Sequence, residues 1–193
     1  AAVSVDNLGA YGTAIGGAMA SGAFASSPVI SSYGGKVYIA FTSTFNTLVA
    51  TDNNTAQDVF VREIDINDSS KSRTILVSVD KDGAASGTGT GASGAFGGTG
   101  SFGPLISQDG RFVAFASYSN NLVVSDTNGA QDIFVRDLLL NRTTLISSNS
   151  AGTDSGKGAS YVPAISGSGS YIAFTSDAGD LVAGDFNNKF DVF

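Results

Sequence analysis

Three acidic segments of the chain share a spacing of side chains that could bind a metal ion. Each segment reads Asp-x-Asn-x-x-x-Asp, and the copies are Asp52/Asn54/Asp58, Asp126/Asn128/Asp132 and Asp185/Asn187/Asp191. Carboxylate and amide oxygens are the ligands that Ca²⁺ prefers, and a calcium ion takes about six to eight of them. The spacing therefore predicts structural calcium at these residues, with main-chain carbonyls, water or another part of the chain supplying the remaining ligands.

The same spacing is also typical of turns that need no metal. An EF-hand loop has an acidic residue at its fifth position and Glu at its twelfth, whereas these segments have neither, and Glu63 is the only Glu of the chain. Asp and Asn side chains close turns by bonding to the nearby main chain, and the last Asp of each segment can hold the start of a strand. Metal-free turns and structural calcium both give these residues a scaffolding role.

The composition excludes several classes of function. The chain has no Cys and no His, so it lacks disulfides, thiolate ligands and the usual general base near neutral pH. It has 10 Lys and Arg against 17 Asp and Glu, and the basic residues are scattered, so nucleic acid and anionic membrane surfaces are not expected partners. No apolar run reaches the roughly 18 residues of a membrane span. A divalent cation suits the net charge of -7.

The acidic segments belong to a repeat that occurs three times. Each copy starts with Pro-x-Ile-Ser, at Pro28, Pro104 and Pro163, and continues through an apolar strand, a Leu-Val pair and the acidic segment. A strand that begins at the last Asp follows, and the first two copies add a fourth strand near Thr74 and Thr144. Apolar residues alternate or run continuously in these strands, which is typical of antiparallel sheets that pack face to face.

This repeat resembles the blade of a bacterial WD40-like (TolB-type) β-propeller. The resemblance implies an all-β fold, a propeller-like array of three four-stranded antiparallel blades in a single domain. Propellers typically have about four to eight blades, so three blades are too few to close a ring. The predicted parts are a displaced strand at 1–8, connections at 9–27, 80–103 and 149–162, and repeats at 28–79, 104–148 and 163–193.

The two ends of the sequence complement each other. The third copy stops at Phe193, inside its third strand, whereas residues 2–5 match the fourth strand at residues 76–79. An open sheet edge is a template for pairing, so we expect the N-terminal strand to complete the last blade, either of its own chain or of a neighbouring copy. Pairing between copies would build filaments where the contacts do not close.

The three connections are rich in Gly, Ala and Ser. Such a composition predicts loops. Alternatively, the connections pack as arms against a neighbouring surface, because long loops within a compact domain often carry function. The anchors of such arms would be Phe24, Phe96, Phe102 and Tyr161.

These features favour a secreted structural or interaction protein, at the cell surface or outside the cell, without enzymatic activity. If the protein is exported, Ala1 is expected to be a processed terminus. The alternative is a lectin-like propeller that binds a glycan or a protein. Its candidate aromatic side chains are Tyr11, Tyr33, Tyr118, Tyr161 and Tyr171.

A hydrolase with paired carboxylates is the least favoured class, because a catalytic site is asymmetric and the marked features of this chain repeat. It would need acidic residues outside the repeated motif, namely Asp154, Asp177 and Asp180. Arg62 and Arg136 occupy equivalent positions and are expected to form ion pairs rather than to act in catalysis.

Overall fold

A computed structural model of the chain describes residues 25–88, 101–187 and 189–193. These residues form three antiparallel sheets, and each sheet is one copy of the repeat. The first, blade 1, contains β1 (Ala25–Tyr33), β2 (Lys36–Ser43), β3 (Asp58–Asp65) and β4 (Arg73–Leu76), with the 3₁₀-helix η1 (Ser69–Lys71) before β4. Blade 2 contains β5 (Ser101–Ile106), β6 (Phe112–Ser117), β7 (Asp132–Asp137) and β8 (Arg142–Leu145). Blade 3 contains β9 (Ser160–Ile165), β10 (Ile172–Ser176) and β11 (Asp191–Val192).

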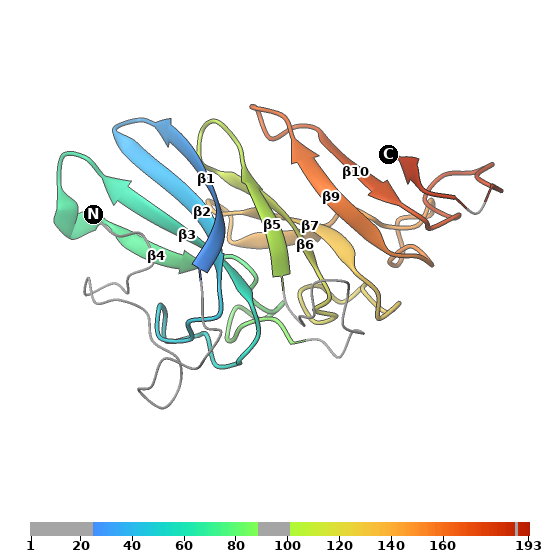
Figure 1. Cartoon of the computed structure of the whole chain (residues 1–193), viewed down its shortest axis with the longest axis horizontal. Coiled ribbons are helices and arrows are strands. Elements are labelled where there is room, and N and C mark those ends of the chain that lie inside the picture. Colours follow the sequence, from blue (N-terminus) through green and yellow to red (C-terminus); the bar gives the residue numbers. More distant parts are fainter. Residues whose placement is uncertain (1–24, 89–100, 188) are drawn as a thin grey trace.

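The strands of each blade lie in chain order, so each blade is a meander. The three blades stand in a row, with blade 1 at one end and blade 3 at the other (Figure 1). The prediction of an all-β fold with antiparallel blades is confirmed, with four strands in blades 1 and 2 and three in blade 3. The described strands form an open array and do not close into a ring.

The first strand of each blade starts before the proline that marks it in the sequence. The strands β1, β5 and β9 therefore reach three residues into the segments predicted as connections. Their pairing with the second strand shifts register next to the proline. The residue before each proline has a positive φ, which is 53° at Ser27, 59° at Gly103 and 50° at Val162. A bulge of this kind lets an edge strand continue through a residue that has no N–H to donate.

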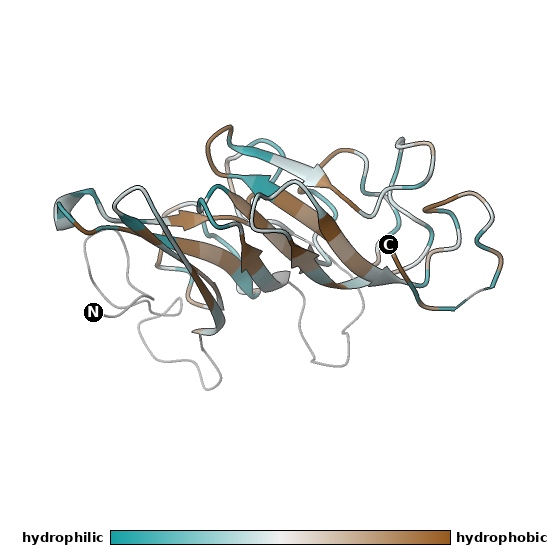
Figure 2. Cartoon of the chain, turned by 90° about the horizontal axis from the view of Figure 1, so that it is seen from above, coloured by the Kyte–Doolittle hydropathy of each residue, from teal (hydrophilic) through white to brown (hydrophobic). Residues whose placement is uncertain are grey.

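Apolar side chains pack between neighbouring blades. Val59 and Val61 of blade 1 lie in one buried cluster with Phe115 and Phe134 of blade 2. A second cluster joins blade 2 to blade 3, and it includes Ile133, Phe174 and Leu181. Figure 2 shows the hydrophobic residues concentrated along the strands. Much of the core therefore consists of interfaces between blades. A further cluster lies within blade 1 and includes Phe41, Phe60 and Leu76.

The tight turn between the first two strands also joins successive blades. A Cβ atom added to Gly110 would lie 2.2 Å from Cδ2 of Tyr38 in blade 1, and one added to Gly169 would lie 2.3 Å from Cδ2 of Phe112 in blade 2. Both glycines also have positive φ values, 74° and 73°. Only glycine suits these positions, because they combine left-handed backbone with contact against an aromatic ring.

Several predictions concern residues outside the described part of the chain. They are the displaced strand at 1–8, most of the connection at 9–27, the candidate aromatic Tyr11, and the packing anchors Phe24 and Phe96. The packing of the Phe102 side chain also lies outside what the structure describes.

Candidate functional site

The acidic segments form the loops that lead into the third strand of each blade. The last Asp of each segment is the first residue of that strand: Asp58 starts β3, Asp132 starts β7 and Asp191 starts β11. The loop before it leaves the second strand, so each segment lies where two neighbouring strands end. The structure therefore gathers each predicted triplet of Asp, Asn and Asp into one loop.

In blades 1 and 2 the last Asp of the loop holds the end of the fourth strand. Ser78 Oγ donates a hydrogen bond to Oδ1 of Asp58 over 2.6 Å and accepts one from the amide of Val59. Ser147 makes the equivalent bond to Oδ1 of Asp132 over 2.5 Å. Each serine therefore links a fourth strand to the start of a third strand. In the sequence, this serine follows an apolar residue just after the fourth strand. We did not predict its role from the sequence.

The Asn of each loop closes the turn and holds the segment that leaves the blade. Asn54 Oδ1 accepts a hydrogen bond from the amide of Ala56, and its Nδ2 donates to the carbonyl of Gly87 over 2.9 Å. Asn128 does the same in blade 2, where its Nδ2 donates to the carbonyl of Gly156 over 2.7 Å. These contacts are those expected of a turn that also fastens the exit from the blade.

The carboxylates of these two loops are buried, and several of their oxygens accept no hydrogen bond. The side chains of Asp52, Asp58, Asp126 and Asp132 are all at least nine-tenths buried. The oxygens without a partner are Asp52 Oδ1, Asp58 Oδ2, both oxygens of Asp126, and Asp132 Oδ2. None of the four residues takes part in the ion pairs of the described chain, whose acidic members are Glu63, Asp68, Asp82 and Asp137. Buried carboxylates without a counter-ion are costly.

Burial raises the pKa of these carboxyl groups. Burial raises the pKa of Asp132 to about 7, the hydrogen bond from Ser147 opposes this increase, and the charge of Asp126 adds to it. Burial raises the pKa of Asp126 to about 6. In blade 1, burial likewise raises the pKa of Asp58 to about 7 and that of Asp52 to about 6. The two carboxyl groups of each loop thus lie close enough to repel each other.

The third acidic loop differs from the other two in burial. Asp185 and Asp191 are half-buried and Asn187 is exposed. Nδ2 of Asn187 donates to Oδ2 of Asp191 over 2.8 Å instead of holding an exit segment. Within the described residues no group of three or more acidic side chains is placed to hold a metal, so a metal in any of these loops would have at most two carboxylate ligands there. Calcium at these residues stays a prediction.

A pocket lined by both polar and apolar residues lies beside Phe193, at the edge where a fourth strand would complete blade 3. Its volume is about 460 Å³, and its apolar lining includes Ile146, Phe174, Leu181 and Phe193. Phe174 and Phe193 stack at 5.8 Å between ring centres. The equivalent phenylalanine pairs of blades 1 and 2 stack in the same way. There the space beside each pair contains a leucine of the fourth strand, Leu76 in blade 1 and Leu145 in blade 2.

The outer face of blade 3 exposes positions that blades 1 and 2 bury. Val192 is 75% exposed, whereas its counterparts Val59 and Ile133 are fully buried against the next blade. Tyr171 is 77% exposed, whereas its counterparts in blades 1 and 2 lie under the turn glycine of the following blade. This face therefore presents side chains that blades 1 and 2 bury against a neighbouring blade, and no blade of the described residues covers it.

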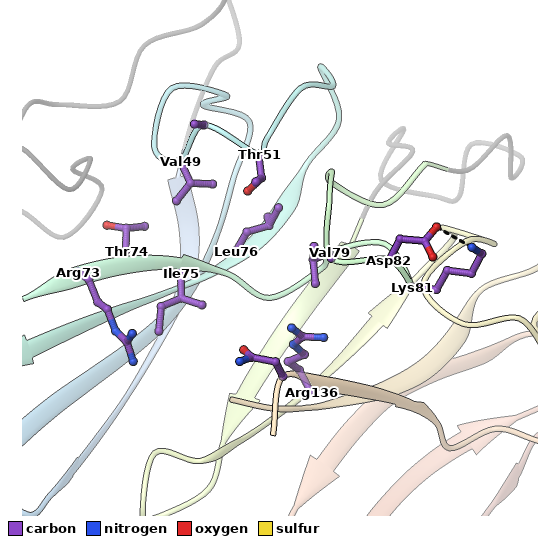
Figure 3. Close-up of a pocket in the computed structure, with 13 residues that line it drawn as sticks. Val49, Thr51, Arg73, Thr74, Ile75, Leu76, Val79, Lys81, Asp82 and Arg136 are labelled. Carbon is purple, nitrogen blue, oxygen red and sulfur yellow. Dashed lines mark hydrogen bonds and ion pairs between the residues drawn. The ribbon is translucent and has the colours of Figure 1, made fainter. Parts of the chain in front are cut away.

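A second cavity, of about 600 Å³, lies between blades 1 and 2 (Figure 3). Of its basic groups, Arg73 pairs with Glu63, and Arg136 Nη1 donates to Oγ1 of Thr143, whereas the buried Nε of Arg136 has no hydrogen-bond partner. The acidic group in the lining, Asp82, is paired with a neighbouring lysine.

The carboxylates proposed for a hydrolase accept hydrogen bonds within loops. Asp154 accepts from Oγ1 of Thr127, and the amides of Ala159 and Lys157 donate to Asp177 and Asp180. These are contacts that shape connections between strands.

The arginines and the aromatic candidates have separate places in the fold. Arg62 and Arg136 donate to threonines of the fourth strands, Thr74 and Thr143, so each lies along its own blade. Of the candidate tyrosines, Tyr33 and Tyr171 are exposed, whereas Tyr161 is half-buried in an edge-on contact with Phe190.

The described part of the chain has no apolar helix of the length that a bilayer crossing requires.

No protein-family model and no curated protein matches the chain. Among solved structures, the chain is similar to the β-propeller domain of the Trilobed protease from Pyrococcus furiosus, which is described as having an open velcro topology. The sequence identity is 14% and the TM-score is 0.38. The match covers 79% of this chain and 34% of the other, so this chain spans about a third of that structure. The similarity is weak, and the description as propeller-like blades rests on the three stacked sheets themselves.

Proposed function

We propose that this protein is a structural and interaction module that associates with itself by blade completion. In this proposal, residues 2–5 of one copy pair with β11 of another copy and become the fourth strand of its blade 3. The observation that carries the proposal is the pocket beside Phe174 and Phe193, at the place where blades 1 and 2 hold a leucine of their own fourth strand.

The fourth strands of blades 1 and 2 define the register of the incoming strand. The sequence Val-Ser-Val-Asp at residues 3–6 is identical to that at residues 77–80. In this register Ser4 takes the place of Ser78 and Ser147, so its hydroxyl would donate to Asp191. The amide of Val3 would donate to the carbonyl of Val192, as the amides of Val77 and Ile146 do to the carbonyls of Val59 and Ile133.

A neighbouring copy suits the edge better than the chain's own N-terminus. Residue 25 opens β1 in blade 1, whereas β11 lies at the opposite end of the row, beyond blade 2 (Figure 1). The exposed face around Tyr171 and Val192 would then contact the same neighbour. Such a contact joins two different surfaces, so it propagates as a filament wherever it does not close.

Cysteine cross-linking tests the register directly, because the chain has no Cys of its own. Phe60 pairs with Leu76 and Phe134 pairs with Leu145, so the register places Ala2 opposite Phe193. We expect a mixture of A2C and F193C chains to form a disulfide-linked heterodimer under mild oxidation, seen on a non-reducing gel. The matched control mixes A2C with V124C, which places a thiol at an exposed site of blade 2.

Two cross-linking results would overturn the proposal. One is a heterodimer yield no higher than that of the V124C control. The other is an A2C/F193C double variant that cross-links only within single chains. Deleting residues 1–8 should leave a monomer at every concentration in analytical ultracentrifugation, with an unchanged circular dichroism spectrum. Unchanged oligomers after this deletion would also contradict the proposal.

A further inference from the structure

We infer that the acidic loops of blades 1 and 2 each bind one divalent cation of the calcium type. The inference is independent of blade completion, because both loops belong to blades that already have four strands. The sequence predicts calcium in all three acidic loops, whereas this inference limits calcium to the loops of blades 1 and 2.

The loop of blade 2 presents oxygens that nothing in the described chain uses. Ser147 occupies Oδ1 of Asp132, so Oδ2 of this residue remains without a donor. Neither oxygen of Asp126 accepts a hydrogen bond of good geometry, although Ser155 lies close enough to lower its pKa, and the charge of Asp126 acts on Asp132. Two buried carboxylates therefore share one loop with unsatisfied oxygens, which is the arrangement that a cation stabilises.

The loop of blade 1 repeats this arrangement and adds a neutral oxygen. Asp52 Oδ1 and Asp58 Oδ2 are buried and unpartnered, as is Oδ1 of Asn46. Asn46 lies beside the loop, because its Nδ2 donates to the carbonyl of Asn54 over 3.4 Å. The three free oxygens come from two carboxylates and one amide, which are hard ligands.

The chemistry of these ligands selects the class of cation. Oxygen ligands suit Ca²⁺, Mg²⁺ or Mn²⁺, whereas the softer metals prefer imidazole and thiolate, which this chain lacks. Two carboxylates give a calcium site little negative charge. We therefore expect a dissociation constant like that of weak extracellular calcium modules, about 10⁻⁴ to 10⁻³ M. Water and main-chain carbonyls would supply the remaining ligands.

Calorimetric titration of the full chain with CaCl₂ after treatment with a chelator tests the inference. We expect two ions per chain for the parent protein, one ion for Asp52→Asn, one for Asp126→Asn and none for the double variant. Asp52 and Asp126 are chosen because neither makes the bond that holds the fourth strand. The matched control is Asp185→Asn, the equivalent change in the exposed third loop, which should still bind two ions.

Circular dichroism shows whether each variant is folded before the titration is interpreted. Absence of calcium binding to the folded parent at about 10 mM would overturn the inference, because a site of the expected class is filled at that concentration. Binding that persists in the folded double variant, or that is lost in Asp185→Asn, would overturn it as well. Native mass spectrometry gives the same stoichiometry by a second route.

Discussion

Blades 2 and 3 have the same sequence pattern, but blade 3 has no fourth strand and no following blade in the described chain, and residues at its open edge and outer face differ in burial from their counterparts. In blade 2, Phe134 and Asp132 are fully buried, and Ser147, just after the fourth strand, donates to the carboxylate. In blade 3, the counterparts Phe193 and Asp191 are half-buried. The comparison teaches that the motif defines a loop, whereas the fourth strand and the exit segment bury it.

The same comparison shows that the motif alone does not bury its carboxylates. The raised pKa of Asp132 comes first from burial, and burial depends on β8 and on the segment after it. Asp191 belongs to the same motif, but it stands in a loop that solvent still reaches. Completing blade 3 would therefore bury its acidic loop as well, so that the protein would have three buried acidic loops.

The largest effect is expected from removing the central phenylalanine. Phe134→Ala should lower the free energy of unfolding by about 3–5 kcal/mol, because it opens a cavity in a packed core. Phe193→Ala in blade 3 should cost distinctly less, since that ring borders a pocket and is partly exposed. Urea unfolding followed by circular dichroism, at a concentration where the chain is monomeric, measures both values. Equal losses would show that blade 3 is as well packed as blade 2.

A smaller loss is expected at the turn that joins the two blades. Gly169→Ala should destabilise the protein by about 2–3 kcal/mol, because the new methyl group meets the ring of Phe112 and the backbone has a positive φ. Gly184→Ala is the matched control, as Gly184 also has a positive φ but open space around its Cα. It should cost only about 1–2 kcal/mol. Equal melting temperatures for the two variants would contradict the proposed contact.

Ser147→Ala is expected to cost about 1–2 kcal/mol. It removes the hydrogen bond to the buried Asp132 and leaves the amide of Ile133 without its acceptor. Ser168→Ala, in the exposed turn of blade 3, should change the melting temperature very little. A neutral Ser147→Ala variant would mean that the fourth strand is held without this bond.

The most gradual effect is a dependence of stability on pH in chelator-treated protein, because it is spread over several pH units. Asp58 and Asp132 have a pKa of about 7 when folded and an ordinary value of 3.8, so the folded state keeps their protons to a higher pH. The free energy of unfolding should therefore be highest below about pH 4 and should fall as the pH rises through about 7. Each carboxyl contributes at most about 1.4 kcal/mol per pH unit.

Asp132→Asn should flatten this pH dependence, whereas Asp191→Asn in the exposed loop should leave it intact. The groups that face Asp132 are Asp126, Asn128 and Ser147, and none of them is basic. Unfolding measured in urea at several pH values tests this difference. A steeper fall in stability toward acid would contradict the sign.

The sequence by itself determined the repeat, and with it much of the fold. The prolines, the apolar strands and the acidic motif predicted antiparallel blades, and the match of residues 2–5 with residues 76–79 predicted which strand could fill the open edge. These features are visible because turn chemistry and alternating apolar residues act over short distances along the chain. The bulge that lets the first strand begin before its proline was not predicted, because it depends on register against a neighbouring strand.

Only the tertiary structure decided which copies of the motif are buried. Asp126 and Asp185 have the same place in the repeat, yet the first is buried with unpartnered oxygens and the second is half-exposed. Gly110 and Gly169 likewise face aromatic rings of the preceding blade, a contact that no local pattern reveals. The physical reason is that burial is a property of neighbours, and the neighbours of each loop are a fourth strand and an adjoining blade.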